Sequence, residues 1–173
     1  MSEANTPGKR RGFTLVEMLV VLMIMGLFVG LVRANMLPSE RDLLRVEAER
    51  LAQILDLAAD EARYTGKSMA WTAEESGYRF WRLGADSEWS ALTGNDSLRA
   101  RSLPQGMSVS ELRVEAAGPQ TLKRLEFPPG GASLAFVIEL SLGAEHYAVA
   151  ASPVGELRIS PGRGKTYADM APK

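Results

Sequence analysis

The chain has 173 residues, which is enough for one compact domain of ordinary size plus an appended segment. Hydrophobic residues make up 46% and charged residues 24% of the chain, and its formal net charge of -1 gives no overall attraction for nucleic acid or an anionic membrane surface. The lack of cysteine excludes disulfides, thiolate metal sites and cysteine nucleophiles.

The first predicted element is an apolar segment at residues 13–32, in which Glu17 is the one charged residue. As a helix, this segment would rise about 30 Å, which matches the hydrocarbon core of a bilayer. It is longer than the apolar region of a secretory signal peptide, about 7–15 residues. We therefore expect residues 13–32 to form a transmembrane helix.

Three basic residues, Lys9, Arg10 and Arg11, lie shortly before this segment. Basic residues that flank a membrane span favour the cytoplasmic side. The sequence therefore predicts a single-pass membrane protein with a cytoplasmic amino terminus and with everything after Arg33 across the membrane. In a bacterium this means the inner membrane and the periplasm.

Glu17 is unusual because it is an ionisable residue about one helical turn inside the apolar segment. A carboxylate in hydrocarbon costs about 2.5–3.5 kcal/mol on insertion scales. Two interpretations are open from position alone. Either the side chain reaches the headgroup region, or a cation meets it when helices assemble.

Residues 33–66 are predicted to form the second half of the amino-terminal helix, outside the membrane. Pro38 suits a bend, Ser39 suits an N-cap, and Gly66 suits the end of a helix. We expect one apolar face to pack against the domain that follows. That face consists of Leu44, Ala48, Leu51, Leu55, Ala58 and Ala62, and it is widened by Leu43, Ile54 and Leu57.

Residues 67–160 are predicted to form a small antiparallel β-sheet domain, so the fold class is α+β. The runs "SMAWTA" and "YRFWRL" flank a turn near Gly77, and "LAFVIELSL", "HYAVAAS" and "GELRIS" suit an antiparallel meander. The chain between these two groups is rich in loop residues, with shorter strands expected at 107–115 and 123–127. Residues 161–173 have little hydrophobicity, and we expect a flexible C-terminal tail there.

The stretch "KRRGFTLVEMLVVLMIMGL" resembles the amino-terminal signal of type IV pilins and type II secretion pseudopilins. The resemblance implies a type IV pilin-like fold and a leader at residues 1–12. It also implies that a prepilin peptidase cleaves between Gly12 and Phe13 and methylates the new amino group of Phe13. Glu17 would then be the assembly glutamate, which pairs with that amino group in the filament.

Later stretches resemble the minor pseudopilin H family, also described as general secretion pathway protein H. They are "EARYTGKSMAW", "GYRFWRL", "LEFPPGGAS" and "YAVAASPVGELRIS". The resemblance implies a structural component of a periplasmic pseudopilus that drives export of folded proteins across the outer membrane. The expected partners are the prepilin peptidase, inner membrane lipid, the major pseudopilin G and the minor pseudopilins I, J and K, with protein H linking the tip complex to the major pseudopilin.

An enzymatic function is not expected. The sequence has no nucleophile elbow, Rossmann fingerprint or phosphate-binding loop, and no cluster with metal-ligand spacing. His146 is the single histidine, and its place in a predicted strand favours an ordinary sheet residue. We therefore expect no catalytic residue, no metal and no cofactor.

The alternative function is that of a minor type IV pilin, in pilus assembly or in DNA uptake. DNA uptake would require basic residues that contact phosphates. From residue 64 to residue 173 the chain carries as many acidic as basic residues, so nucleic acid is not an expected partner. The basic residues considered for such contacts are Arg99, Arg101, Lys123, Arg124, Arg158, Arg163 and Lys165.

Overall fold

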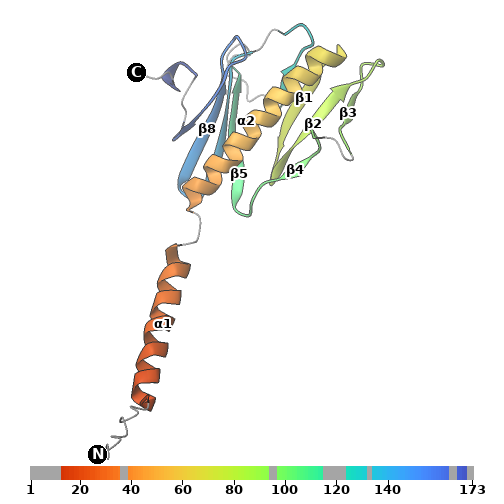
Figure 1. Cartoon of the computed structure of the whole chain (residues 1–173). Coiled ribbons are helices and arrows are strands. Elements are labelled where there is room, and N and C mark those ends of the chain that lie inside the picture. The colour runs from red at the N-terminus through yellow and green to blue at the C-terminus, as the bar shows by residue number, and fades with distance from the viewer. Residues whose placement is uncertain are drawn as a thin grey trace, which may run out of the picture. The chain divides into compact units, whose positions relative to one another are not determined.

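A computed structural model of the chain describes residues 13–35, 39–93, 97–114, 124–131, 134–163 and 167–170. The chain divides into two compact units, Met1–Leu37 and Pro38–Lys173. The first unit contains helix α1, and the second contains helix α2, the strands and the hydrophobic core (Figure 1).

Helix α1 runs from Leu15 to Asn35 and is apolar around its whole circumference. Its side chains from Leu15 to Arg33 are all exposed in the structure. A helix that is apolar on every side is suited to a lipid environment or to the core of a bundle, and not to water. The predicted segment at residues 13–32 therefore forms a helix over nearly its whole length.

Helix α2 runs from Glu40 to Thr65, and both of its ends carry the predicted caps. The Ser39 hydroxyl accepts a hydrogen bond from the Asp42 backbone N–H at 3.2 Å, and the Asp42 carboxylate accepts one from the Ser39 backbone N–H at 3.4 Å. This reciprocal pair is a capping box. At the other end Gly66 adopts φ 68°, a left-handed conformation that glycine tolerates without strain, and its N–H donates to the Ala62 carbonyl.

The apolar face of α2 forms one side of the core. The six residues predicted for its centre are all buried: Leu44, Ala48, Leu51, Leu55, Ala58 and Ala62. Of the three residues expected to widen this face, Ile54 is buried, whereas Leu43 and Leu57 are 37% and 42% exposed. The face is thus narrower than predicted, and Glu47, paired with Arg50 at 2.8 Å, is the acidic residue buried beside it.

The first sheet begins with the hairpin of β1 (Met69–Glu74) and β2 (Gly77–Leu83). Strand β3 (Trp89–Ala91) pairs with β2, and β6 (Arg124–Phe127) pairs with β1, which gives the order β3-β2-β1-β6. The two-residue strand β4 (Arg101–Ser102) also pairs with β2. All of these pairings are antiparallel.

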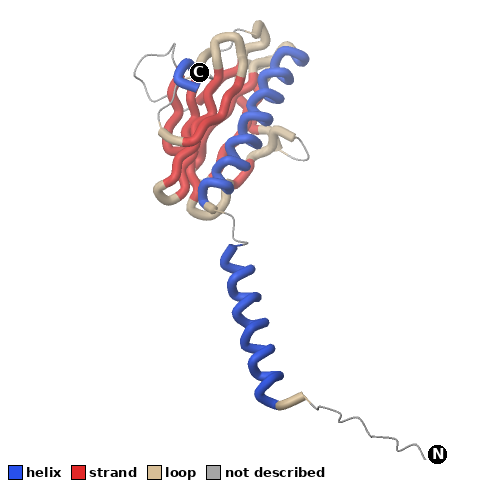
Figure 2. Tube along the Cα trace, turned by 60° about the vertical axis from the view of Figure 1, so that its left-hand side comes forward, coloured by secondary structure: helices blue, strands red, loops and turns tan. Residues whose placement is uncertain are grey.

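The second sheet has the order β5-β7-β8-β9. Strands β7 (Phe136–Leu142), β8 (Glu145–Ala151) and β9 (Leu157–Pro161) form the predicted antiparallel meander. Strand β5 (Met107–Val114) pairs with β7 in an antiparallel register that shifts between Val109 and Glu111. Helix α2 packs against strands of both sheets, as both views show (Figures 1 and 2).

Two features of the β domain differ from the sequence-based prediction. The strands form two sheets and not one, because β6 returns to the open edge of β1 while β5 pairs with β7. Strands β3 and β4 were expected as loop, since they have only three and two residues and are defined by their pairing with β2. Residues 115 and 123, the outer limits of two predicted strands, lie outside the described residues.

The C-terminal segment also differs from the prediction of a tail at residues 161–173. Strand β9 includes Pro161, and a short 3-10 turn, η2, runs from Ala168 to Met170. Tyr167 and Met170 pack against a small buried cluster formed by Val137, Ala148 and Ala150. The physical reason is that a tyrosine and a methionine at this spacing supply enough apolar surface to dock a short segment.

Candidate functional site

The amino-terminal end of α1 contains the residues of the predicted signal that the structure describes. Phe13 is 75% exposed and precedes the helix. The Thr14 hydroxyl accepts a hydrogen bond from the Glu17 backbone N–H at 3.3 Å, and the Thr14 carbonyl accepts from Glu17 and Met18. Thr14 therefore caps α1, and it places Glu17 in the first turn.

The capping function of Thr14 was missed in the sequence analysis. The signal for it is the spacing in "TLVE", because a threonine followed three residues later by glutamate is the sequence pattern of a capping box. Lys9, Arg10, Arg11 and Gly12 lie outside the described residues. The structure thus positions Phe13, Thr14 and Glu17 together at the start of one apolar helix.

This helix meets the length and composition of a membrane span. The span includes residues Leu15–Arg33, with a mean hydropathy of 2.7. At about 1.5 Å per residue, Glu17 lies about 3 Å along the helix axis from Leu15. The carboxylate is therefore close to the amino-terminal end of the span, next to the dipole end that favours negative charge.

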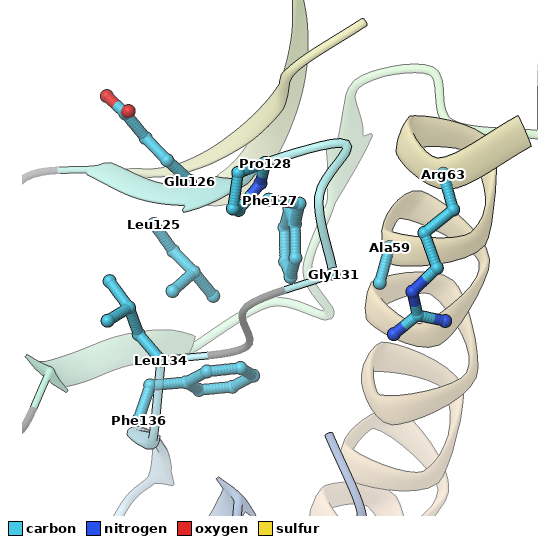
Figure 3. A pocket seen from close by; sticks show the side chains of 9 residues that line it. All are labelled: Ala59, Arg63, Leu125, Glu126, Phe127, Pro128, Gly131, Leu134 and Phe136. Atoms are coloured by element: carbon cyan, nitrogen blue, oxygen red, sulfur yellow. The ribbon is translucent and has the colours of Figure 1, made fainter. Parts of the chain in front are cut away.

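In the second unit, a shallow pocket lies between α2, β6 and the segment that leads into β7 (Figure 3). Phe127 and Phe136 project toward it from the two sheets, and their rings are 6.5 Å apart in an edge-to-face arrangement. Ala59 lies on the α2 side, and Arg63, which pairs with Asp60 at 2.6 Å, is at the rim.

A charged network lies on the second sheet. Glu139 is 5% exposed, and its carboxylate accepts a hydrogen bond from the Ser110 hydroxyl at 3.0 Å. His146 Nδ1 lies 2.9 Å from Glu139 Oε1, and His146 Nε2 accepts from Arg163 Nε at 2.8 Å. His146 thus lies in a strand, β8, as predicted, and it contacts Glu139 of β7 and Arg163, which follows β9.

Of the basic residues considered for phosphate contacts, Arg101, Arg124 and Arg158 lie on three different strands, whereas Arg99 and Arg163 lie outside the strands. Arg124 pairs with Glu126 at 3.0 Å, and Arg158 pairs with Glu156 at 3.2 Å. Lys123 and Lys165 lie outside the described residues. Among the described residues, no group of three or more His, Asp or Glu side chains could hold a metal ion.

Comparisons with known proteins agree with this geometry. A model of the prokaryotic N-terminal methylation motif matches residues 7–32, and the model described as "Type II transport protein GspH" matches residues 47–155. The type II secretion system protein H of Aeromonas hydrophila is 34% identical over 101 residues. That match covers 57% of this chain and 55% of the relative, so it spans a little over half of the relative's length.

Two solved structures of the minor pseudopilin EpsH from the type II secretion system of Vibrio cholerae have the same fold. One is 21% identical with a TM-score of 0.55, and it covers 69% of this chain and 98% of that chain. The other is 19% identical with a TM-score of 0.59, and it covers 73% and 100% respectively. At these identities the likeness concerns the fold.

An apolar amino-terminal helix with a methylation motif, followed by a second helix packed on antiparallel sheets, defines a type IV pilin-like protein. Because the family model covers residues 47–155, the class can be narrowed further. The chain belongs to the type II transport protein GspH family, the minor pseudopilins H of type II secretion. These are structural proteins and not enzymes, and the family favours secretion over the type IV pilus alternative.

Proposed function

We propose that this minor pseudopilin joins the tip complex of the pseudopilus to the major pseudopilin G below it. Residues 13–32 anchor it in the inner membrane, with the leader 1–12 in the cytoplasm and residues 33–66 and 67–160 in the periplasm. The observation that carries this proposal is the combination of one apolar helix, a basic leader and a methylation motif in a member of the H family.

The first step is maturation by a prepilin peptidase. The peptidase hydrolyses the bond between Gly12 and Phe13 and methylates the amino group that this cleavage releases. Glycine suits the position before the bond because it has no side chain to obstruct the approach of the peptidase to the backbone. Phe13 lies just before α1 and is exposed, which supports access to its backbone.

The second step is assembly through Glu17. An amino terminus is largely protonated at neutral pH, so the Phe13 amine of a neighbouring subunit carries a positive charge. Within a bundle of apolar helices, a charge without a partner is energetically costly. Pairing the amine with the Glu17 carboxylate gives both charges a partner. Charge thereby selects the register between subunits, while the apolar side chains of α1 supply the packing.

The experiment is an in vivo comparison of Glu17→Gln with the wild-type chain. Glutamine keeps the size and hydrogen-bonding capacity of the side chain but removes its charge, so membrane insertion should continue. We expect incorporation into the pseudopilus, measured by cross-linking to pseudopilin G, to fall by about tenfold or more, which corresponds to about 1.4 kcal/mol of lost pairing.

The matched control is Glu75→Gln, which removes an exposed carboxylate from the turn between β1 and β2. It should leave cross-linking unchanged.

Gly12→Trp should leave the leader attached, which mass spectrometry detects directly. Normal incorporation of the Glu17→Gln chain would refute the assembly function of Glu17, and a mature mass for Gly12→Trp would refute the cleavage site.

Contact with the tip complex is tested separately by cross-linking from the periplasmic unit. A photo-reactive residue at Leu134, which is 40% exposed beside the pocket of Figure 3, should cross-link to one of the pseudopilins I, J or K. The same probe at Glu75 serves as the control position. Cross-links to pseudopilin G alone would contradict the linking function without affecting the anchoring or assembly steps.

A further inference from the structure

The outer face of the second sheet carries an apolar patch where solvent would favour polar residues. Residues of β7 and β8 alternate in direction, so Ile138 and Val149 face the main core while their neighbours face away from it. On that outer side, Val137, Ala148 and Ala150 are 4%, 0% and 0% exposed. An outer face of an antiparallel sheet is ordinarily polar, so this patch must be covered.

The cover comes from the same chain. Tyr167 and Met170 pack against Val137, Ala148 and Ala150, and the turn η2 contacts β9. Figure 2 shows this short turn near the C-terminus, lying over strands of the sheet. Burial of apolar surface by these two side chains is the favourable term that holds the segment in place.

Polar contacts fasten the segment at two further points. The Tyr167 hydroxyl donates a hydrogen bond to the Glu156 carboxylate, and the Arg158 guanidinium lies 4.6 Å from the centre of the Tyr167 ring. Before the turn, the Gly162 N–H donates to the His146 carbonyl at 2.9 Å, and Arg163 Nε donates to His146 Nε2 at 2.8 Å.

The electrostatics of Glu156 agree with this arrangement. Hydrogen bonds from Tyr167 and Arg158 lower the pKa of the Glu156 carboxyl below its ordinary value. The hydrogen bond to Glu156 correspondingly raises the pKa of the Tyr167 phenol. Both pKa shifts mean that the contact favours a charged Glu156 carboxylate that accepts a hydrogen bond from a neutral Tyr167 phenol.

We infer that residues 167–170 form a C-terminal clasp that closes an apolar patch on the outer face of the second sheet, so that this face is unavailable to other subunits while the clasp is in place. The occupant of the patch is thus a segment of this chain. Release of the clasp would expose a strip of small apolar side chains on the adjacent strands β7 and β8.

Cysteine accessibility tests the clasp directly, because the chain has no cysteine of its own. A reporter Ala148→Cys lies under the clasp, and a reporter Val149→Cys lies on the opposite face of the same strand; both parent residues are 0% exposed. The full chain in detergent micelles is treated with a maleimide, with and without Tyr167→Ala and Met170→Ala together. Ala150→Cys is a second reporter under the clasp.

With the clasp intact, all three reporters should react slowly. In the double alanine variant, Ala148→Cys and Ala150→Cys should react at least about tenfold faster while Val149→Cys is unchanged, which identifies a local opening of the outer face. Equal rates with and without the clasp residues would overturn the proposal. Equal acceleration at all three positions would also overturn it, since the segment would then be an integral part of the domain core.

Discussion

Replacing Tyr78 with phenylalanine removes a buried hydroxyl from the core between α2 and the first sheet. Tyr78 is 0% exposed, and its ring lies 6.1 Å from the rings of both Trp71 and Phe80. None of the described residues forms a hydrogen bond with its hydroxyl. An unpaired buried hydroxyl costs about 1–3 kcal/mol, so Tyr78→Phe should be as stable as the wild-type protein at pH 7, or more stable.

The pH dependence of this substitution follows from the phenol. Burial, together with the negative charge of the nearby Glu47, raises the pKa of Tyr78 from 10.0 to about 12. The unfolded chain therefore loses this proton at lower pH than the folded protein does. The stability that the folded protein gains from holding the Tyr78 proton more tightly is fully present below pH 10 and is lost as the pH rises toward 12. At about 1.4 kcal/mol per pH unit, the loss reaches up to about 3 kcal/mol.

The assay is urea unfolding of the full chain in detergent micelles, followed by tryptophan fluorescence. All three tryptophans, Trp71, Trp81 and Trp89, lie in the second unit, so the signal reports on that unit alone. The difference in unfolding free energy between Tyr78→Phe and the wild type should be constant from pH 7 to about 9 and should widen above pH 10. A constant difference up to pH 12, or a less stable variant at pH 7, would refute the reasoning.

Three further substitutions test other parts of the fold. Ser39→Ala removes the capping box of α2 and should lower the unfolding free energy by about 1 kcal/mol, whereas Ser102→Ala, at an exposed serine, should have little effect. Gly77→Ala should lower the unfolding free energy by about 2 kcal/mol, because an ideal Cβ at this position lies 2.2 Å from the Arg101 carbonyl oxygen. The control in the same urea assay is Gly130→Ala, because a Cβ added at Gly130 meets nothing within 4 Å. Tyr167→Phe should lower the melting temperature at pH 7. The difference in melting temperature between the variant and the wild type should shrink as the pH falls through the lowered pKa of Glu156. The reason is that the hydrogen bond from Tyr167 stabilises the fold fully above the ordinary pKa of 4.5, and this stabilisation is lost when the Glu156 carboxylate is protonated. A difference that stays constant from pH 7 to pH 3 would exclude the Tyr167–Glu156 contact as its source.

The local features of this protein were predictable where neighbouring residues alone determine the structure. The N-cap at Ser39 and the end of α2 at Gly66 were predicted because a side-chain oxygen and a left-handed glycine act within one turn. The meander of β7, β8 and β9 was predicted because short turns separate strongly apolar runs. The family resemblance was also carried by contiguous stretches, and the family comparison confirmed it.

Features that depend on partners distant in the sequence were predicted less well. Strands β3 and β4 exist only through their pairing with β2. Leu43 and Leu57 are exposed although their helical spacing would extend the apolar face of α2, because the width of a buried face depends on the sheets that cover it. The pocket beside Phe127 and Phe136 likewise forms between two sheets that the sequence analysis had treated as one.

The sequence by itself determined the apolar helical segment, the amphipathic helical segment that follows it and the main strands, because each arises from periodicity and short-range hydrogen bonding. The methylation motif was carried by a contiguous stretch that resembles a known signal. Three features depended on the tertiary structure alone. They are the division of the strands into two sheets, the burial of Glu139 and Tyr78, and the covering of the outer face of β8 by Tyr167 and Met170. These outcomes depend on which apolar surfaces meet when the chain folds, and no stretch of neighbouring residues contains that information.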